Sequence, residues 1–189
     1  MKKNPEITNA TRQAFVDAFC QLYKVQPIES ITVTELTDKA GYNRCTFYRY
    51  FNDIYALLTY IENLLLEHIK KSIAEHIEID DIIENFVPTF VKVFDDNDIY
   101  YKVLLDNPNS TRFADRLKTD MTPILMKKFR MPAEEPHAGY VMEFYLSALV
   151  STIAYWVHHQ KNISAAELGK MVQGFLENGV LSQLNKYKM

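Results

Sequence analysis

The stretch that decides the fold covers residues 31–51 and reads ITVTELTDKAGYNRCTFYRYF. Thr32 and Glu35 have the spacing of a capping box. In that motif the threonine hydroxyl accepts a hydrogen bond from the third helical N–H, and the glutamate reaches back to the threonine N–H. The pattern therefore predicts a short helix that begins at Val33.

A second short helix is expected directly after the first. Gly41 follows Ala40 and supplies the left-handed residue that commonly ends a helix. Asn43 can then cap a helix from Arg44 to about Phe51. Two short helices joined by a glycine-containing turn of three or four residues are typical of a helix-turn-helix.

The second of these helices carries more polar and aromatic side chains than a small core needs. Leu36, Phe47 and Phe51 can pack inward against a preceding helix. The crowded outer set is Tyr42, Asn43, Arg44, Cys45, Thr46, Tyr48, Arg49 and Tyr50. Arginines can grip guanine edges or phosphates, and tyrosine hydroxyls can reach phosphate oxygens. The pattern favours a DNA-recognition helix; the alternative is an ordinary helical hairpin with solvated tyrosines and arginines.

The remainder of the chain also shows helical periodicity, and no stretch predicts a strand. We expect an all-α protein with an N-terminal three-helix DNA-binding domain at residues 1–52 and a C-terminal helical domain at residues 53–189. The helices expected outside the helix-turn-helix are 5–24, a long helix opened by Asn52 and Asp53, 81–94, 98–105, 110–129, 136–159 and 164–184. Pro88 and Pro123 should kink or interrupt two of them.

Charge is distributed unevenly between the two halves. Residues 1–52 hold seven basic and five acidic residues, a net charge of +2, and residues 53–189 hold fourteen and nineteen, a net charge of −5. The sequence has two cysteines, no membrane-spanning run and no signal peptide at its start. We therefore expect a cytoplasmic protein that makes no membrane contact.

The segment also resembles the DNA-binding domain of the TetR family of bacterial regulators, over about residues 8–60. The similarity lies in the Ala40-Gly41 turn, Thr46-Phe47-Tyr48, the pair Tyr50-Phe51 and Leu57-Leu58. The resemblance implies binding to a double-stranded DNA operator, with Tyr48 contacting a phosphate. The residues implied in DNA contact are Thr32, Thr34, Tyr42, Asn43, Arg44, Cys45, Thr46, Tyr48, Arg49 and Tyr50.

Three positions depart from the family pattern. Cys45 stands where the family often has glycine, and Ile54 stands where many members have a phosphate-contacting lysine. Gln26-Pro27 replaces a glycine that often ends the first helix. Cys45 is either a redox switch, because nearby arginines would lower its pKa, or simply an accommodated small side chain.

The resemblance implies that the C-terminal part dimerises, and its last two helices contain residues suited to that role. Small residues allow close approach and aromatic residues supply apolar area, so two helices per subunit could form a four-helix interface. The alternative is packing within one chain. The candidate homodimer residues are Tyr140, Phe144, Ser147, Ser151, Tyr155, Phe175, Leu176, Gly179 and Val180.

The family often binds a small effector, and an apolar or aromatic effector could enter a cavity between helices. The candidate lining residues are Phe86, Phe90, Tyr101, Phe113, Met121, Met142, Tyr145 and Trp156. Each could equally be plain core. An effector would act by favouring a spacing of the DNA-binding heads that does not fit the operator, which makes the protein a repressor.

The sequence also allows other functions. A TetR-type protein could answer to a protein partner or act as an activator, and an exposed apolar patch within residues 80–160 would favour that version. An all-α enzyme would need perturbed titratable groups converging in a pocket, and the sequence offers no such cluster.

We expect neither metal nor cofactor, since the adjacent His158 and His159 cannot easily face one ion from a helix.

Overall fold

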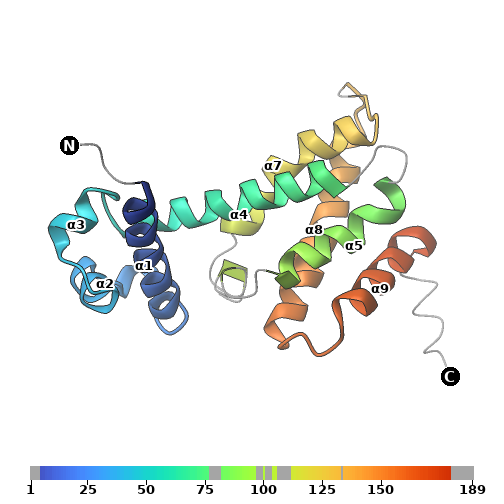
Figure 1. Cartoon of the computed structure of the whole chain (residues 1–189). Helices are drawn as coiled ribbons and strands as arrows, with labels where there is room; N and C mark the ends of the chain where they lie inside the picture. The colour runs from blue at the N-terminus through green and yellow to red at the C-terminus, as the bar shows by residue number, and fades with distance from the viewer. Residues whose placement is uncertain are drawn as a thin grey trace. The chain divides into compact units, whose positions relative to one another are not determined.

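A computed structural model describes residues 5–76, 82–96, 100, 104–105, 112–132 and 134–179, without the side chains of residues 5–8, 75–76, 82–86 and 96. Its described part is all-α, as expected, and contains no strand. The helices are α1 (Pro5–Tyr23), the 3-10 helix η1 (Ile28–Ser30), α2 (Val33–Ala40), α3 (Arg44–Tyr48), α4 (Ile54–His76), α5 (Ile82–Asp96), α7 (Arg112–Lys128), α8 (Ala138–His158) and α9 (Ala165–Asn178) (Figure 1).

The chain forms two compact units, residues 1–65 and residues 66–189. The division falls inside α4, whereas the sequence placed a boundary at 52/53. The first turns of α4 belong with the N-terminal unit because their apolar residues, Ile54, Leu57, Leu58 and Ile61, are buried there.

The N-terminal unit has an aromatic core supplied mainly by α1. Phe15 and Phe19 are fully buried, and Leu22 and Tyr23 extend the same face of the helix. The spacing of these residues is that of one helical stripe. Helix α1 packs against α2, and α2 against α3, so the two short helices share this core.

In the C-terminal unit, α5 packs most extensively with α9, and α7 lies along α8 (Figure 1). Helices α5 and α9 approach closely at Gly169, where an added Cβ would lie 3.5 Å from Pro88 Cα. Of the expected kink or interruption at Pro88 and Pro123, the interruption does not occur, because α5 and α7 each continue through their proline.

Two helices end several residues before their expected bounds. Helix α3 ends at Tyr48, whereas the sequence predicted a helix to about Phe51. Helix α9 ends at Asn178, before the expected end at residue 184, and Gly179 follows with a φ of 73°. Most of the helix expected at 98–105 lies outside the described residues.

Helix α8 is long and apolar enough to cross a membrane by length and composition alone, with a mean hydropathy of 1.2. Leu146, Leu149, Ile153 and Trp156 are buried along one side of it. That side contributes to the core of the C-terminal unit, which accounts for much of the helix's apolar character.

Replacing Phe47 should destabilise the N-terminal unit. The Phe47→Ala change removes a fully buried ring from between α1 and α3, which costs about 3–5 kcal/mol in the free energy of unfolding. Urea denaturation followed by circular dichroism measures it. The exposed neighbour Cys45 is the control, since Cys45→Ala should change stability by no more than about 0.5 kcal/mol. Equal effects of the two substitutions would contradict the assignment of Phe47 to the core.

Candidate nucleic-acid interface

The start of α2 is fixed by a side-chain cap. Thr32 Oγ1 accepts a hydrogen bond from the Glu35 N–H at 3.2 Å, as the capping box predicts. The expected return bond from Glu35 to the Thr32 N–H is not made. The Glu35 carboxylate instead accepts from Gln26 Nε2 at 3.0 Å, because Gln26, after the end of α1, is brought beside the first turn of α2. This bond ties the two segments together.

The turn between α2 and α3 is shaped by Gly41 and Asn43. Gly41 has a φ of 74°, in the left-handed region that glycine tolerates best, and confirms the expected stop of α2. Asn43 Oδ1 accepts from the Thr46 N–H at 2.8 Å and from Thr46 Oγ1 at 3.0 Å. The cap therefore occupies the oxygen of Asn43 and leaves the Nδ2 donors for an external partner.

One phenylalanine of α1 supports this whole region. The Phe15 ring lies 5.4 Å from the rings of Tyr42 and Phe47, and 6.3 Å from those of Tyr50 and Phe51, between ring centroids. These distances lie in the range of favourable edge-to-face and tilted aromatic pairs. Tyr42 and Tyr50 are thus partly packed, and their positions depend on α1.

The structure brings the ten residues implied in DNA contact together in the N-terminal unit. They occupy the start of α2, the turn, α3 and the residues just after it. Arg44 and Arg49 are exposed, and Tyr48 is 56% exposed although it flanks the buried Phe47. Thr34, Thr46 and Tyr50 are half-buried, and the other members of the set are exposed.

The position of Ile54 explains one departure from the family pattern. Ile54 is buried at the start of α4, so it serves the core and cannot contact DNA. The adjacent Asp53 caps α4 by accepting from the Ala56 N–H at 2.7 Å.

Sequence reasoning missed two residues beside this surface, Arg12 and Tyr60. The Arg12 guanidinium carbon lies 5.5 Å from the Tyr50 ring centroid and 5.9 Å from that of Tyr60. An arginine at the polar edge of an amphipathic helix gives no signal of such a neighbourhood, because Tyr60 is far away in the sequence.

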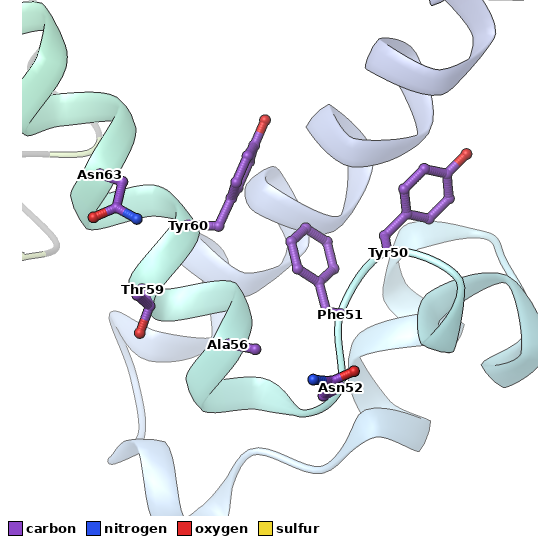
Figure 2. A pocket seen from close by; sticks show the side chains of 7 residues that line it. All are labelled: Tyr50, Phe51, Asn52, Ala56, Thr59, Tyr60 and Asn63. Carbon is purple, nitrogen blue, oxygen red and sulfur yellow. The ribbon is translucent and has the colours of Figure 1, made fainter.

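Tyr50 and Tyr60 also line an open pocket of about 250 Å³ in the N-terminal unit. Figure 2 shows Phe51 between the two tyrosines, with its ring 5.4 Å from that of Tyr60. The remaining lining residues are Asn52, Ala56, Thr59 and Asn63. None of the candidate effector residues belongs to this pocket.

Comparison with known proteins identifies the family. The model of a transcriptional regulator C-terminal region, TetR_C_8, matches residues 80–178, more than half of the chain. The chain belongs to the TetR family of transcriptional regulators. No curated protein matches it.

Solved TetR structures share the fold over nearly the whole chain. A TetR transcriptional regulator from Streptococcus agalactiae is 21% identical, with a TM-score of 0.67, and the match covers 92% of this chain and 99% of that one. The fatty acid degradation regulator FadR from Bacillus halodurans is 16% identical, with a TM-score of 0.67 and coverage of 95% and 98%. TetR regulators bind DNA and act as dimers, and they are not enzymes.

The residues expected at a TetR dimer interface separate into exposed and half-buried groups. Tyr140, Phe144 and Tyr155 on α8 are 79%, 69% and 65% exposed. Ser151 and Gly179 are exposed, Phe175 and Leu176 are half-buried, and Val180 lies outside the described residues. Ser147 is half-buried and donates to Glu143 Oε1 at 2.8 Å, an oxygen that Lys118 Nζ also contacts at 2.8 Å.

The candidate effector residues are mostly interior to the C-terminal unit. Phe90, Phe113, Met121, Met142 and Trp156 are buried, and Tyr145 is half-buried, where burial raises the pKa of its hydroxyl. Trp156 Nε1 donates to the Ile163 carbonyl at 2.8 Å, so its polar group is already used. The side chain of Phe86 and all of Tyr101 lie outside the described part of the chain.

The two cysteines should differ sharply in reactivity. Cys45 is exposed on α3, whereas Cys20 is buried in α1. Burial, and secondarily the charge of Asp17, raise the pKa of the Cys20 thiol to about 12. Since the thiolate is the reactive form, a thiol reagent at neutral pH should label one cysteine in the folded protein and the second only after unfolding. Cys45→Ser should abolish the fast phase. Two fast phases in the folded wild type would show that Cys20 is accessible.

Proposed function

We propose that the protein is a sequence-specific DNA-binding homodimer, and that it represses transcription until a small apolar or aromatic effector binds its C-terminal unit. One observation supports the DNA-binding part of this proposal. Helix α3 rests on buried Phe47 and the Phe15 ring, and it presents Arg44, Tyr48 and Arg49 to solvent.

The dimensions of α3 suit the major groove. Five helical residues extend about 7.5 Å, and the groove is about 12 Å wide. Arg44 lies at the start of α3, where a recognition helix contacts base edges. Tyr48, at the other end, can donate its hydroxyl to a phosphate, and Thr34 in the first turn of α2 lies where helix N–H groups attract a second phosphate.

The exposed side of α8 supports dimerisation through this helix. Tyr140, Phe144, Ser147, Ser151 and Tyr155 are spaced by four, three, four and four residues, so they share one helical face. Large exposed aromatics separated by serines are unusual on a monomer surface. A second copy would cover them, and a dimer supplies the two recognition helices that half-sites about 34–36 Å apart, or a multiple of that spacing, require.

The effector proposal rests on the family and on the apolar interior of the C-terminal unit. Phe90 on α5, Phe113 and Met121 on α7, and Met142 on α8 are all buried there. An effector accommodated among these helices would have to bind the DNA-incompetent arrangement more tightly than the competent one, because only differential affinity shifts an equilibrium.

Two substitutions test the DNA-binding proposal. Arg44→Ala should weaken binding to the operator by about 1–3 kcal/mol, since it removes a bidentate contact. Tyr48→Phe, which removes one hydroxyl, should cost about 1 kcal/mol. Mobility shift with competitor DNA measures both, first on the DNA upstream of the coding region and then on a duplex selected from a random pool.

Gln21→Ala is the control, because Gln21 is exposed on α1 and lies outside the proposed contact set. It should bind DNA as the wild type does. Failure of the wild type to bind any sequence from the random pool would end the DNA-binding proposal.

A charge placed on the exposed face of α8 tests the dimer proposal. Phe144→Asp should yield a folded monomer, because an interface that buries Phe144 would have to desolvate an unpaired carboxylate. Sedimentation velocity measures the mass and circular dichroism checks the helix content. Lys92→Asp, at an exposed position of α5, should stay dimeric. A dimeric Phe144→Asp variant would place the interface elsewhere.

A second candidate function is activation, or control by a protein partner. One solved relative of the same fold is named as the dihydroxyacetone kinase operon activator DhaS, at 18% identity and a TM-score of 0.58. The exposed face of α8 lies within residues 80–160, the range in which an exposed apolar patch favours control by a protein partner. A transcription reporter under the selected operator separates the two, since loss of the protein raises expression for a repressor and lowers it for an activator.

A further inference from the structure

Three half-buried lysines of the C-terminal unit have carboxylate partners within the chain. Lys70 Nζ lies 3.0 Å from Asp120, Lys118 Nζ lies 2.8 Å from Glu143, and Lys161 Nζ lies 2.9 Å from Asp95. Partial burial removes water from a charge, and a partner of opposite charge offsets that loss.

Arg12 of α1 is also half-buried, but its surroundings are different. Two aromatic rings lie near its guanidinium, those of Tyr50 at 5.5 Å and Tyr60 at 5.9 Å. Among the described residues the guanidinium has no ion pair and no hydrogen bond. Ring faces attract the charge, yet they offer no acceptor to the five N–H donors of the arginine.

The position of Arg12 puts this charge beside the candidate DNA-binding surface. Arg12 precedes Phe15 by three residues, so the two side chains share a face of α1. Phe15 packs on Tyr42 and Tyr50, both of which belong to the proposed DNA-contact set. Figure 2 shows the hydroxyls of Tyr50 and Tyr60 pointing toward the same side.

We propose that Arg12, flanked by the Tyr50 and Tyr60 rings, is an anion site that binds a backbone phosphate of the operator DNA. This inference rests on the proposed DNA-binding function. Arg12 lies on α1 and Tyr60 on α4, both outside the helix-turn-helix, whereas Tyr50 follows α3. The site would therefore add a phosphate contact to those proposed for α2 and α3.

The chemistry of the three side chains fits a phosphate. A guanidinium presents a planar fork that matches two phosphate oxygens, and stacking against aromatic rings restricts its motion before the ligand arrives. The tyrosine hydroxyls can donate to the same group. A phosphate contact carries no sequence information, so Arg12 contributes affinity and orientation rather than base selection.

The test compares full-length wild type with Arg12→Gln on two duplexes, the operator selected from a random pool and an unrelated sequence. Each phosphate that a protein neutralises contributes about 0.9 to the slope of log affinity against log salt. The slope for Arg12→Gln should therefore be shallower by about 0.9, and both duplexes should bind about tenfold more weakly. The ratio of the two affinities should not change.

Lys24→Gln is the matched control. Lys24 is an exposed cation just after the other end of α1, and its removal should leave the slope unchanged. If Arg12→Gln fails to fold, Arg12→Met replaces it, because methionine keeps an apolar stem near the rings and removes the charged guanidinium. The expected slope change is the same.

Two results would overturn the inference in distinguishable ways. An unchanged slope in a folded Arg12 variant, with the wild type binding tightly, would make Arg12 only a positioning residue for Tyr50 and leave the DNA-binding function intact. Failure of the wild type itself to bind any duplex would end both proposals together.

Inorganic phosphate separates the DNA backbone from a free anion as the source of the phosphate group. Without DNA, phosphate should raise the thermal midpoint of wild type and Arg12→Gln equally, because one half-exposed guanidinium binds a freely hydrated anion only weakly, whereas the other contacts of the DNA hold its phosphate in place. Selective stabilisation of the wild type by phosphate, combined with an unchanged salt slope, would assign the site to a free anion and overturn its assignment to DNA.

Discussion

The packing of the Phe15 ring is the contact on which the candidate interface depends. This ring of α1 meets Tyr42 in the turn, Phe47 in α3 and Tyr50 after it. A five-residue helix is too short to be stable by itself in water, so α3 exists because its buried side is held against α1. The solvent-exposed residues of α3 are therefore held in position by its buried residues.

Helix α8 also has a buried side and an exposed side. One side of this helix buries Leu146, Ile153 and Trp156 in the core of the C-terminal unit, and the other exposes Tyr140, Phe144 and Tyr155. The two sides are both apolar, which is why the helix passes a composition test for a membrane span. A helix with two apolar sides is expected to pack on both of them. Within the described residues the core covers one side, and the proposed dimer interface would cover the other.

Local sequence signals predicted local structure well. The Thr32 and Asn43 caps, the left-handed Gly41 and the starts of α2 and α3 follow from interactions within a few residues of one another. Expectations that depended on distant residues were less successful. Glu35 accepts a hydrogen bond from Gln26 instead of bonding to its own helix start, because the end of α1 lies beside the first turn of α2. Helices α5 and α7 continue through Pro88 and Pro123.

The sequence by itself determined the helix-turn-helix, the all-α class and the candidate residues for DNA contact, because periodicity, caps and turn residues act over one or two helical turns. Only the tertiary structure decided which side chains are exposed and which lie near one another. It buried Ile54, exposed the aromatic face of α8 and placed the Arg12 guanidinium near the rings of Tyr50 and Tyr60. The physical reason is that burial and charge pairing are set by residues far apart in the chain, whose meeting no local pattern records.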